Sequence, residues 1–395
     1  MIALSFPGSA GTKESIVPEA FDVSALPEDA ARAVLAGRVM LAGGPVPVIV
    51  REGRVYDVSA VAETTADLFD LDDPAGVEGS HLCDIADLTV GGGTHALLAP
   101  IDLQCVKACG VTFAVSAIER VIEERARGDA GQAAAIRAEL EDKIGGGIRA
   151  VVPGSEDAAK LKVALIEAGM WSQYLEVAIG PDAEVFTKAP VLSSVGWGEQ
   201  VGIRSDSSWN NPEPEVVVIV NAAGKVIGAT LGNDVNLRDF EGRSALLLGK
   251  AKDNNAACAI GPFVRLFDAD FGIDDVRNAE LDLLIEGPEG YRLDGHSSMN
   301  QISRDPLELV RQTLSEHQYP DGFALFLGTL FAPVQDRDDP GRGFTHKVGD
   351  TVRIHSPRLG TLANVVTTSK DAAPWTFGIR DLYRSIAARR VAEPA

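Results

Sequence analysis

Two glutamates stand directly before a run of apolar, mostly β-branched residues. Glu213 and Glu215 precede residues 216–220, whose sequence VVVIV is typical of a buried strand. Alternation along a strand points both carboxylates to the same face, where one would have to take up a proton unless a cation lay between them. A hard divalent ion such as Mg²⁺ prefers such oxygen ligands. The spacing therefore indicates a metal site, although solvated edge charges or an ion pair with Arg238 would produce the same pattern.

A third carboxylate follows in the same stretch. Residues 222–225 (AAGK) form a turn signal, and residues 226–230 (VIGAT) are typical of the return strand of a hairpin. In such a hairpin Asp234 comes back beside the start of the first strand. Three carboxylates with open coordination positions would make a catalytic metal site.

Several motifs resemble the fumarylacetoacetate hydrolase superfamily over about residues 100–395. The motifs are NPEPE (211–215), GNDVNLRD (232–239), GT (328–329), FTKAP (186–190), AKDNNA (251–256), VGDTV (348–352) and GTLAN (360–364). The chain is most similar to the sugar-acid dehydratases of that superfamily, which act on 2-keto-3-deoxy-D-xylonate or 2-keto-3-deoxy-L-arabinonate. The resemblance does not distinguish these two stereochemistries.

This resemblance implies a fold and a set of site residues. The implied fold is α+β and β-rich, a mixed β-roll with flanking helices. The implied Mg²⁺ ligands, with Mn²⁺ able to substitute, are Glu213, Glu215 and Asp234, and Lys252 is the implied active-site lysine. The candidates for substrate binding are Ser116, Arg238, Gly328 and Thr329, although Arg238 could instead brace the ligand loop through an ion pair with Asp239.

The chain departs from the hydrolases of the superfamily at one position. Those enzymes carry a His and, three residues later, a Glu, and here Ser116 stands at the place of the His while Glu119 remains. A carbon–carbon hydrolase needs such a pair to activate water, whereas dehydration needs only a base and an acid. We therefore expect a dehydratase, with an acylpyruvate-type hydrolase and a non-enzymatic binding protein as alternatives.

The expected reaction converts a 2-keto-3-deoxypentonate to 2,5-dioxopentanoate (α-ketoglutarate semialdehyde) in non-phosphorylative pentose catabolism. The metal ion would make the carbon 3 proton more acidic, and Lys252 would stabilise the enolate. Glu119 is the candidate for one proton transfer at carbon 3 or at the carbon 4 hydroxyl. The alternative for Glu119 is a solvated position on a charged helix.

The elements that must position these residues follow from the apolar periodicity. Residues 46–50 and 54–58 predict short strands in a small N-terminal α/β domain, residues 1–98, followed by a catalytic domain, residues 99–395. Apolar residues at helical spacing predict a helix over residues 116–128. Further strands are predicted at 323–327 and 351–354.

Composition narrows the range of partners. The chain of 395 residues has 36 Lys and Arg against 57 Asp and Glu, a formal net charge of −21. Such a charge repels nucleic acid and anionic membranes, so we expect a small-molecule substrate instead. Four irregularly spaced cysteines and the lack of a long apolar run favour a cytoplasmic protein. The resemblance suggests a homodimer or homotetramer.

Overall fold

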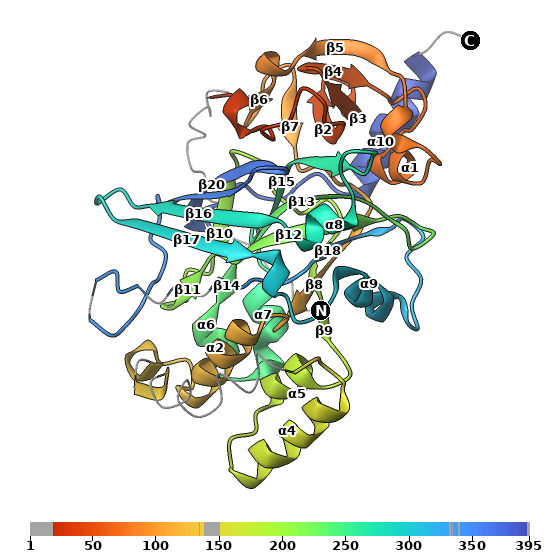
Figure 1. Cartoon of the computed structure of the whole chain (residues 1–395). Coiled ribbons are helices and arrows are strands. Elements are labelled where there is room, and N and C mark those ends of the chain that lie inside the picture. Colours follow the sequence, from red (N-terminus) through yellow and green to blue (C-terminus); the bar gives the residue numbers. More distant parts are fainter. Residues whose placement is uncertain are drawn as a thin grey trace, which may run out of the picture.

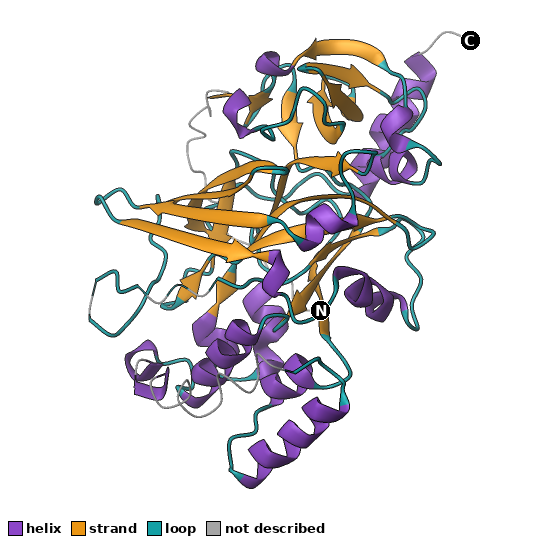
Figure 2. Ribbon diagram, in the orientation of Figure 1, coloured by secondary structure: helices purple, strands orange, loops and turns teal. Residues whose placement is uncertain are grey.

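A computed structural model describes residues 19–392, except residues 134, 138–150, 332, 334 and 339. Two large sheets lie at its centre, with helices around them, as Figure 2 shows. This confirms the predicted β-rich fold of mixed sheets with flanking helices. Residues 1–18 of the predicted N-terminal domain lie outside the described residues.

The larger sheet has 13 strands within the described part of the chain, and the order along its main path is β1-β6-β7-β2-β15-β13-β12-β18-β8-β9. Its central strands are β8 (Cys105–Gly110), β9 (Glu184–Ala189), β12 (Pro214–Val220), β13 (Val226–Asp234), β15 (Cys258–Leu266) and β18 (Phe323–Phe326). Its N-terminal strands are β1 (Glu19–Ala20), β2 (Leu35–Leu41), β3 (Gly44–Arg51), β4 (Arg54–Asp57), β5 (Ser80–Asp84), β6 (Thr89–Val90) and β7 (Ala96–Leu98).

The second sheet has the order β10-β20-β19-β16-β17, and a short third sheet pairs β11 with β14. The strands of the second sheet are β10 (Gln200–Ile203), β16 (Glu280–Glu286), β17 (Arg292–Ser298), β19 (Thr351–Ser356) and β20 (Gly360–Thr368). The third sheet consists of β11 (Asn210–Asn211) and β14 (Asn236–Leu237). These two short strands lie immediately outside the carboxylates of the predicted hairpin.

Helices cover the ends of the sheets (Figure 1). They are α1 (Thr65–Phe69), α2 (Ala114–Arg125), α4 (Glu156–Glu167), α5 (Gln173–Ile179), α6 (Arg238–Glu241), α7 (Leu248–Lys252), α8 (Ile273–Arg277), α9 (Pro306–Leu314) and α10 (Ile379–Ala392). The predicted helix over residues 116–128 is confirmed as α2, which begins two residues earlier and ends three residues earlier. Figure 1 shows α2, α4, α5, α6 and α7 gathered at the lower end of the molecule.

The predicted hairpin is confirmed as β12 and β13. These strands are antiparallel, with Val217 opposite Thr230 and Glu215 opposite Gly232. Both faces of β12 are buried, because Val216 and Val218 pack toward the second sheet while Val217 packs in a separate cluster with Phe326. A strand buried on both faces reads as a continuous apolar run, which explains the sequence VVVIV.

The N-terminal strands continue the same sheet as the hairpin. Strand β2 pairs with β15, with Ala36 opposite Val264, and the buried Arg265 beside it donates from Nη2 to Asp29 Oδ2 at 2.8 Å. Through β15 these strands adjoin β13, which ends at Asp234. The division of the chain into domains at residue 98 stays a prediction.

Gly232 permits a close approach in this hairpin. A Cβ at this position would lie 2.3 Å from Phe326 Cε1 and 2.6 Å from Val217 Cγ2. We expect Gly232→Ala to lower the free energy of unfolding by about 1–3 kcal/mol, because a packed core resists added volume. Urea unfolding followed by circular dichroism measures this loss. Gly249→Ala is the control, since its Cβ would meet nothing within 4 Å, and equal stability of the two variants would contradict the prediction.

Candidate active site

Three acidic side chains converge where β12 begins and β13 ends. Glu213 lies just before β12, Glu215 is its second residue, and the Asp234 backbone N–H donates to the Glu213 carbonyl oxygen at 3.0 Å. One carboxylate oxygen from each of the three lies within 4.8 Å of the others, and all three residues are buried. The hairpin register therefore brings the three predicted ligands together.

Burial and mutual repulsion both oppose ionisation of the carboxyl groups in this cluster. Burial raises the pKa of Glu215 well above its usual range, and the charges of Asp234 and Glu213 raise it further. Burial also opposes ionisation of Asp234, but Lys188 and Lys252 outweigh that effect and lower its pKa. A divalent cation would relieve the repulsion that favours protonated Glu215, so the donor set fits a hard metal ion.

Lys252, at the end of α7, lies against two of the three carboxylates. Its ammonium donates to Glu213 Oε2 at 2.5 Å and to Asp234 Oδ2 at 3.0 Å. Burial lowers the pKa of this lysine, but Asp234 and Glu213 have the larger combined effect and raise it. The ammonium is therefore a fixed positive charge at the edge of the site, suited to stabilising an anion.

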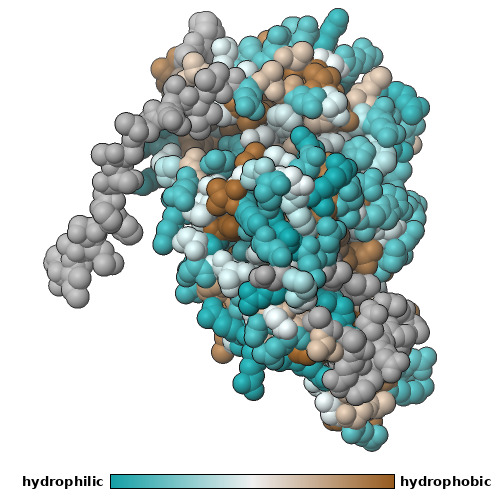
Figure 3. Space-filling view, turned by 90° about the vertical axis from the view of Figure 1, so that its left-hand side faces the viewer, coloured by the Kyte–Doolittle hydropathy of each residue, from teal (hydrophilic) through white to brown (hydrophobic). Residues whose placement is uncertain are grey.

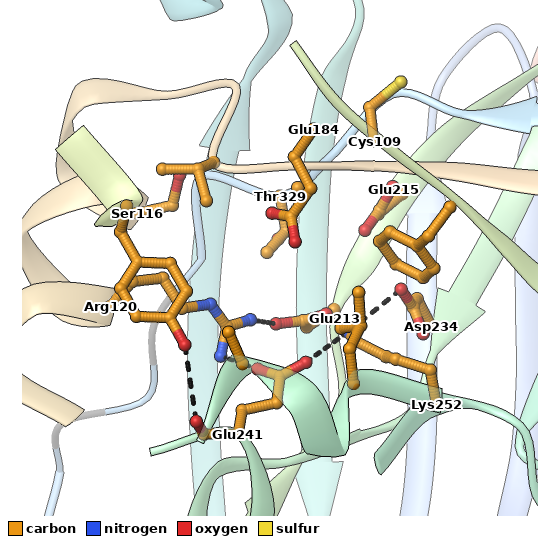
Figure 4. A pocket seen from close by; sticks show the side chains of 16 residues that line it. Cys109, Ser116, Arg120, Glu184, Glu213, Glu215, Asp234, Glu241, Lys252 and Thr329 are labelled. Atoms are coloured by element: carbon orange, nitrogen blue, oxygen red, sulfur yellow. Dashed lines mark hydrogen bonds and ion pairs between the residues drawn. The ribbon is translucent and has the colours of Figure 1, made fainter. Parts of the chain in front are cut away.

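The carboxylates line a pocket that several distant segments build (Figure 4). Ser116 on α2 and Thr329, which follows β18, both line it, and the Ser116 hydroxyl donates to the Phe113 carbonyl oxygen at 2.7 Å. The Gly328 backbone N–H donates to Glu215 Oε2 at 2.6 Å, so this residue contacts a candidate ligand directly. The structure thus gathers these three predicted residues around the carboxylates.

Arg120, Glu184 and Glu241 also line the pocket, and sequence reasoning missed them. Arg120 Nη2 donates to Glu213 Oε1 at 2.5 Å, and its Nη1 pairs with Glu241. Burial raises the pKa of Glu241 to about 7, against the opposing charges of Arg120 and Lys252. Glu241 Oε1 lies 3.7 Å from Lys252 Nζ, so Arg120, Glu241 and Lys252 belong to one connected network of charges in the pocket wall.

Glu184, the first residue of β9, differs from its neighbours. Figure 4 shows its carboxylate pointing into the pocket, and within the described residues no ion pair to Glu184 is found. Burial raises its pKa, although Arg120 and Lys252 act in the opposite direction. A partly buried carboxyl group whose pKa is raised is suited to donating a proton.

Glu119 and Arg238 lie outside the residues that line the pocket. Arg238 Nη2 donates to Glu119 Oε2 at 2.9 Å, and its Nε donates to Glu123 Oε1 at 2.6 Å. Glu119 also accepts two hydrogen bonds from Arg137, at 2.8 and 2.6 Å. The solvated position considered for Glu119 is wrong, since the residue is buried in this ion-pair network.

The predicted ion pair between Arg238 and Asp239 is also wrong. Arg238 begins α6, where adjacent residues point in different directions, so its guanidinium reaches α2 instead. Asp239 accepts hydrogen bonds from the Ser207 hydroxyl and the Ser208 backbone N–H, both at 2.9 Å. The alternative to a metal site, an ion pair of Arg238 with Glu213 or Glu215, is wrong as well. Arg238 pairs with Glu119 and Glu123 instead.

The surface is predominantly hydrophilic on the face that Figure 3 shows, and hydrophobic residues form small separate patches there. Within the described ranges, no helix has the length and apolar character needed to cross a bilayer.

Comparison with known proteins identifies related sequences. The model of the fumarylacetoacetate hydrolase C-terminal family matches residues 172–367. A Haloferax volcanii protein named "Probable 2-keto-3-deoxyxylonate dehydratase" is 32% identical over 202 residues, which cover 51% of this chain and 66% of the relative. A 2-dehydro-3-deoxy-D-arabinonate dehydratase of Saccharolobus solfataricus is 32% identical over 183 residues, 46% of this chain and 58% of the relative. Both matches cover less than two thirds of the relative's length.

Solved structures share the fold. An apo form of 2-keto-3-deoxy-D-arabinonate dehydratase has a TM-score of 0.60 at 22% identity, and covers 85% of this chain and 99% of its own. The same enzyme complexed with magnesium and 2,5-dioxopentanoate has a TM-score of 0.59 at 22% identity and the same coverage. At this level of identity the likeness establishes the fold.

Proposed function

We propose that this chain, whose residues 172–367 match the model of the fumarylacetoacetate hydrolase C-terminal family, is a magnesium-dependent hydro-lyase that converts a 2-keto-3-deoxypentonate to 2,5-dioxopentanoate. The observation that carries the proposal is the convergence of Glu213, Glu215 and Asp234 within 4.8 Å, beside Lys252 and one pocket. The names of the two curated relatives, a xylonate-derived and an arabinonate-derived dehydratase, support the substrate class.

Glu213, Glu215 and Asp234 would hold the Mg²⁺ ion, and Mn²⁺ is expected to replace it. When bound, the ion supplies electron withdrawal from a 2-oxo acid, which makes its carbon 3 proton more acidic. Lys252 supplies a fixed positive charge where negative charge develops. Thr329 and Ser116 line the pocket and are placed to contact the substrate. Ser116 would do so through a hydroxyl group, where the related hydrolases have the ring nitrogen of a His.

Proton transfer is better assigned to Glu184 than to Glu119. Loss of the carbon 3 proton and the carbon 4 hydroxyl releases one water, and a later hydrogen shift from carbon 5 gives the aldehyde. The leaving hydroxyl needs a proton donor. Glu184 reaches the pocket with a raised pKa, whereas Arg137 and Arg238 occupy Glu119.

Replacement of Glu184 and of Glu119, one at a time, tests which of the two transfers the proton. We expect Glu184→Gln to lower kcat by roughly 10²–10⁴-fold, the usual contribution of a general acid or base. Glu119→Gln should keep kcat within about tenfold and lower the thermal midpoint, because it removes a charge partner from two arginines. Steady-state kinetics and thermal unfolding of both variants check this. The reverse order of effects on kcat would return the proton-transfer role to Glu119.

A substrate screen tests the proposed function. The full chain with Mg²⁺ is incubated with the 2-keto-3-deoxy acids of both pentonates, and the product is oxidised by an aldehyde dehydrogenase that reports through nicotinamide reduction. The proposal expects a semialdehyde from at least one substrate. Release of pyruvate or a short acid would instead indicate carbon–carbon hydrolysis, and no turnover of either acid would overturn the proposed substrate class.

Removal of the metal provides an independent check. EDTA is expected to stop turnover, and Mg²⁺ in excess should restore it. The thermal midpoint should rise when Mg²⁺ is added to metal-free protein, because a ligand that binds the folded state stabilises it. Turnover that is unaffected by exhaustive chelation would contradict the metal assignment.

We further propose a cytoplasmic homodimer or homotetramer that takes a small sugar acid and neither nucleic acid nor membrane as partner. The net charge of −21 supports the exclusion of polyanions. Light scattering of the purified chain gives the number of subunits.

A further inference from the structure

A second lysine, Lys188 on β9, lies behind the carboxylates and has no part in the mechanism proposed above. Its exposed fraction is 0%, and it is not among the residues that line the pocket. An ammonium group without access to water is costly unless each of its three hydrogens finds an acceptor. Its partners therefore indicate why it is there.

All of these partners belong to the candidate site or directly adjoin it. Lys188 Nζ lies 2.8 Å from Asp234 Oδ1, donates to the Lys252 carbonyl oxygen at 2.5 Å, and lies 3.4 Å from the Val235 carbonyl oxygen. One buried ammonium thus joins a candidate metal ligand to the backbone of the active-site lysine. Strand β9, the junction between β13 and β14, and the end of α7 meet at this single group.

The two lysines divide the oxygens of Asp234 between them. Lys188 pairs with Oδ1 from the buried side, whereas Lys252 donates to Oδ2 from the pocket side and to Glu213 as well. The Lys252 ammonium therefore lies against carboxylate oxygens of two residues that would hold a divalent ion, whereas Lys188 contacts Asp234 from outside the residues that line the pocket.

We propose that Lys188 is a positioning residue that fixes Asp234 and the Lys252 backbone for the divalent ion, while the Lys252 ammonium competes with that ion. The inference rests on the proposed metal site but on no particular substrate. The two lysines therefore have opposite effects on metal affinity. Loss of Lys188 frees Asp234 to move and weakens binding, whereas loss of the Lys252 ammonium removes a competing positive charge and strengthens it.

The experiment measures Mn²⁺ binding to the full chain without substrate, by electron paramagnetic resonance of the free ion. We expect Lys188→Met to raise the Kd by about 10–100-fold, the usual range for a residue that orients a metal ligand. Lys252→Met should lower the Kd by about tenfold, since one neighbouring charge commonly shifts such an equilibrium by that factor or more. Lys107→Met is the matched control, because Lys107 donates to Thr187 on the same pair of strands and should leave the Kd unchanged.

Unchanged Mn²⁺ affinity in Lys188→Met would overturn the proposal, as would a change of the same sign in both lysine variants. Circular dichroism shows whether each variant folds. If Lys188→Met does not fold, Lys188→Gln, which keeps a donor for the Lys252 carbonyl oxygen, replaces it, and failure of both to fold would make Lys188 a scaffold residue only. Wild-type protein that binds Mn²⁺ but dehydrates no sugar acid would refute the proposed substrate alone.

Discussion

Glu215→Gln is expected to abolish dehydration, with kcat lower by about 10³-fold or more, and to remove the response to Mg²⁺. The amide has the shape of the carboxyl group but carries no charge, so one of three anionic ligands is lost. The Gly328 N–H can still donate to the remaining amide oxygen, which preserves the local backbone. Steady-state kinetics over a Mg²⁺ titration measure both effects.

The stability of the same variant should change in an informative direction. Burial and like charges raise the pKa of Glu215, so ionised Glu215 destabilises the metal-free fold. A neutral amide relieves that strain, and the thermal midpoint without metal should stay equal or rise, while the increase on adding Mg²⁺ should disappear. Glu199→Gln is the control, because Glu199 is partly buried, also has a raised pKa, and accepts from the Gly196 N–H outside the pocket. Full activity of Glu215→Gln would remove this residue from the site.

Lys252→Met is expected to lower kcat by about 10³-fold while the protein stays folded. Methionine fills a similar volume but cannot stabilise developing negative charge, a contribution commonly worth about 10²–10³ in kcat for a single donor. KM should change less than kcat, because the interaction strengthens in the transition state.

Metal binding by the same variant distinguishes loss of the ammonium group from loss of the metal ion. The variant should bind Mn²⁺ at least as tightly as wild type, so its lost activity would not reflect a lost metal ion. Lys107→Met again serves as the control and should keep full activity. A kcat within tenfold of wild type would exclude Lys252 from the reaction.

The hairpin and its three carboxylates could be predicted because they depend on local rules. Strand alternation sets the faces of Glu213 and Glu215, and one short turn returns Asp234 beside them. Each relation spans a single pair of neighbouring strands. One contiguous stretch of sequence is therefore enough to predict how the three carboxylates lie.

The remainder of the pocket depends on contacts between distant segments. Arg120, Glu184 and Glu241 come from α2, β9 and α6, and nothing in their local spacing brings them together. The resemblance predicts Arg238 and Glu119 at the substrate, yet they form a buried ion-pair network beside the pocket. Which of several charged residues on one helix points inward is decided by packing, and α2 alone carries acidic and basic groups on several sides.

The pairing of β2 with β15 has a consequence for how this chain can be divided. A fragment starting near residue 99 would lack β2 and Asp29, so the Val264 region of β15 would become a bare strand edge and the buried Arg265 would lose its carboxylate partner. Open edges of this kind invite intermolecular strand pairing and aggregation. A fragment of residues 99–395 is therefore expected to aggregate unless the N-terminal strands are present, although those strands contribute no residue to the active-site pocket.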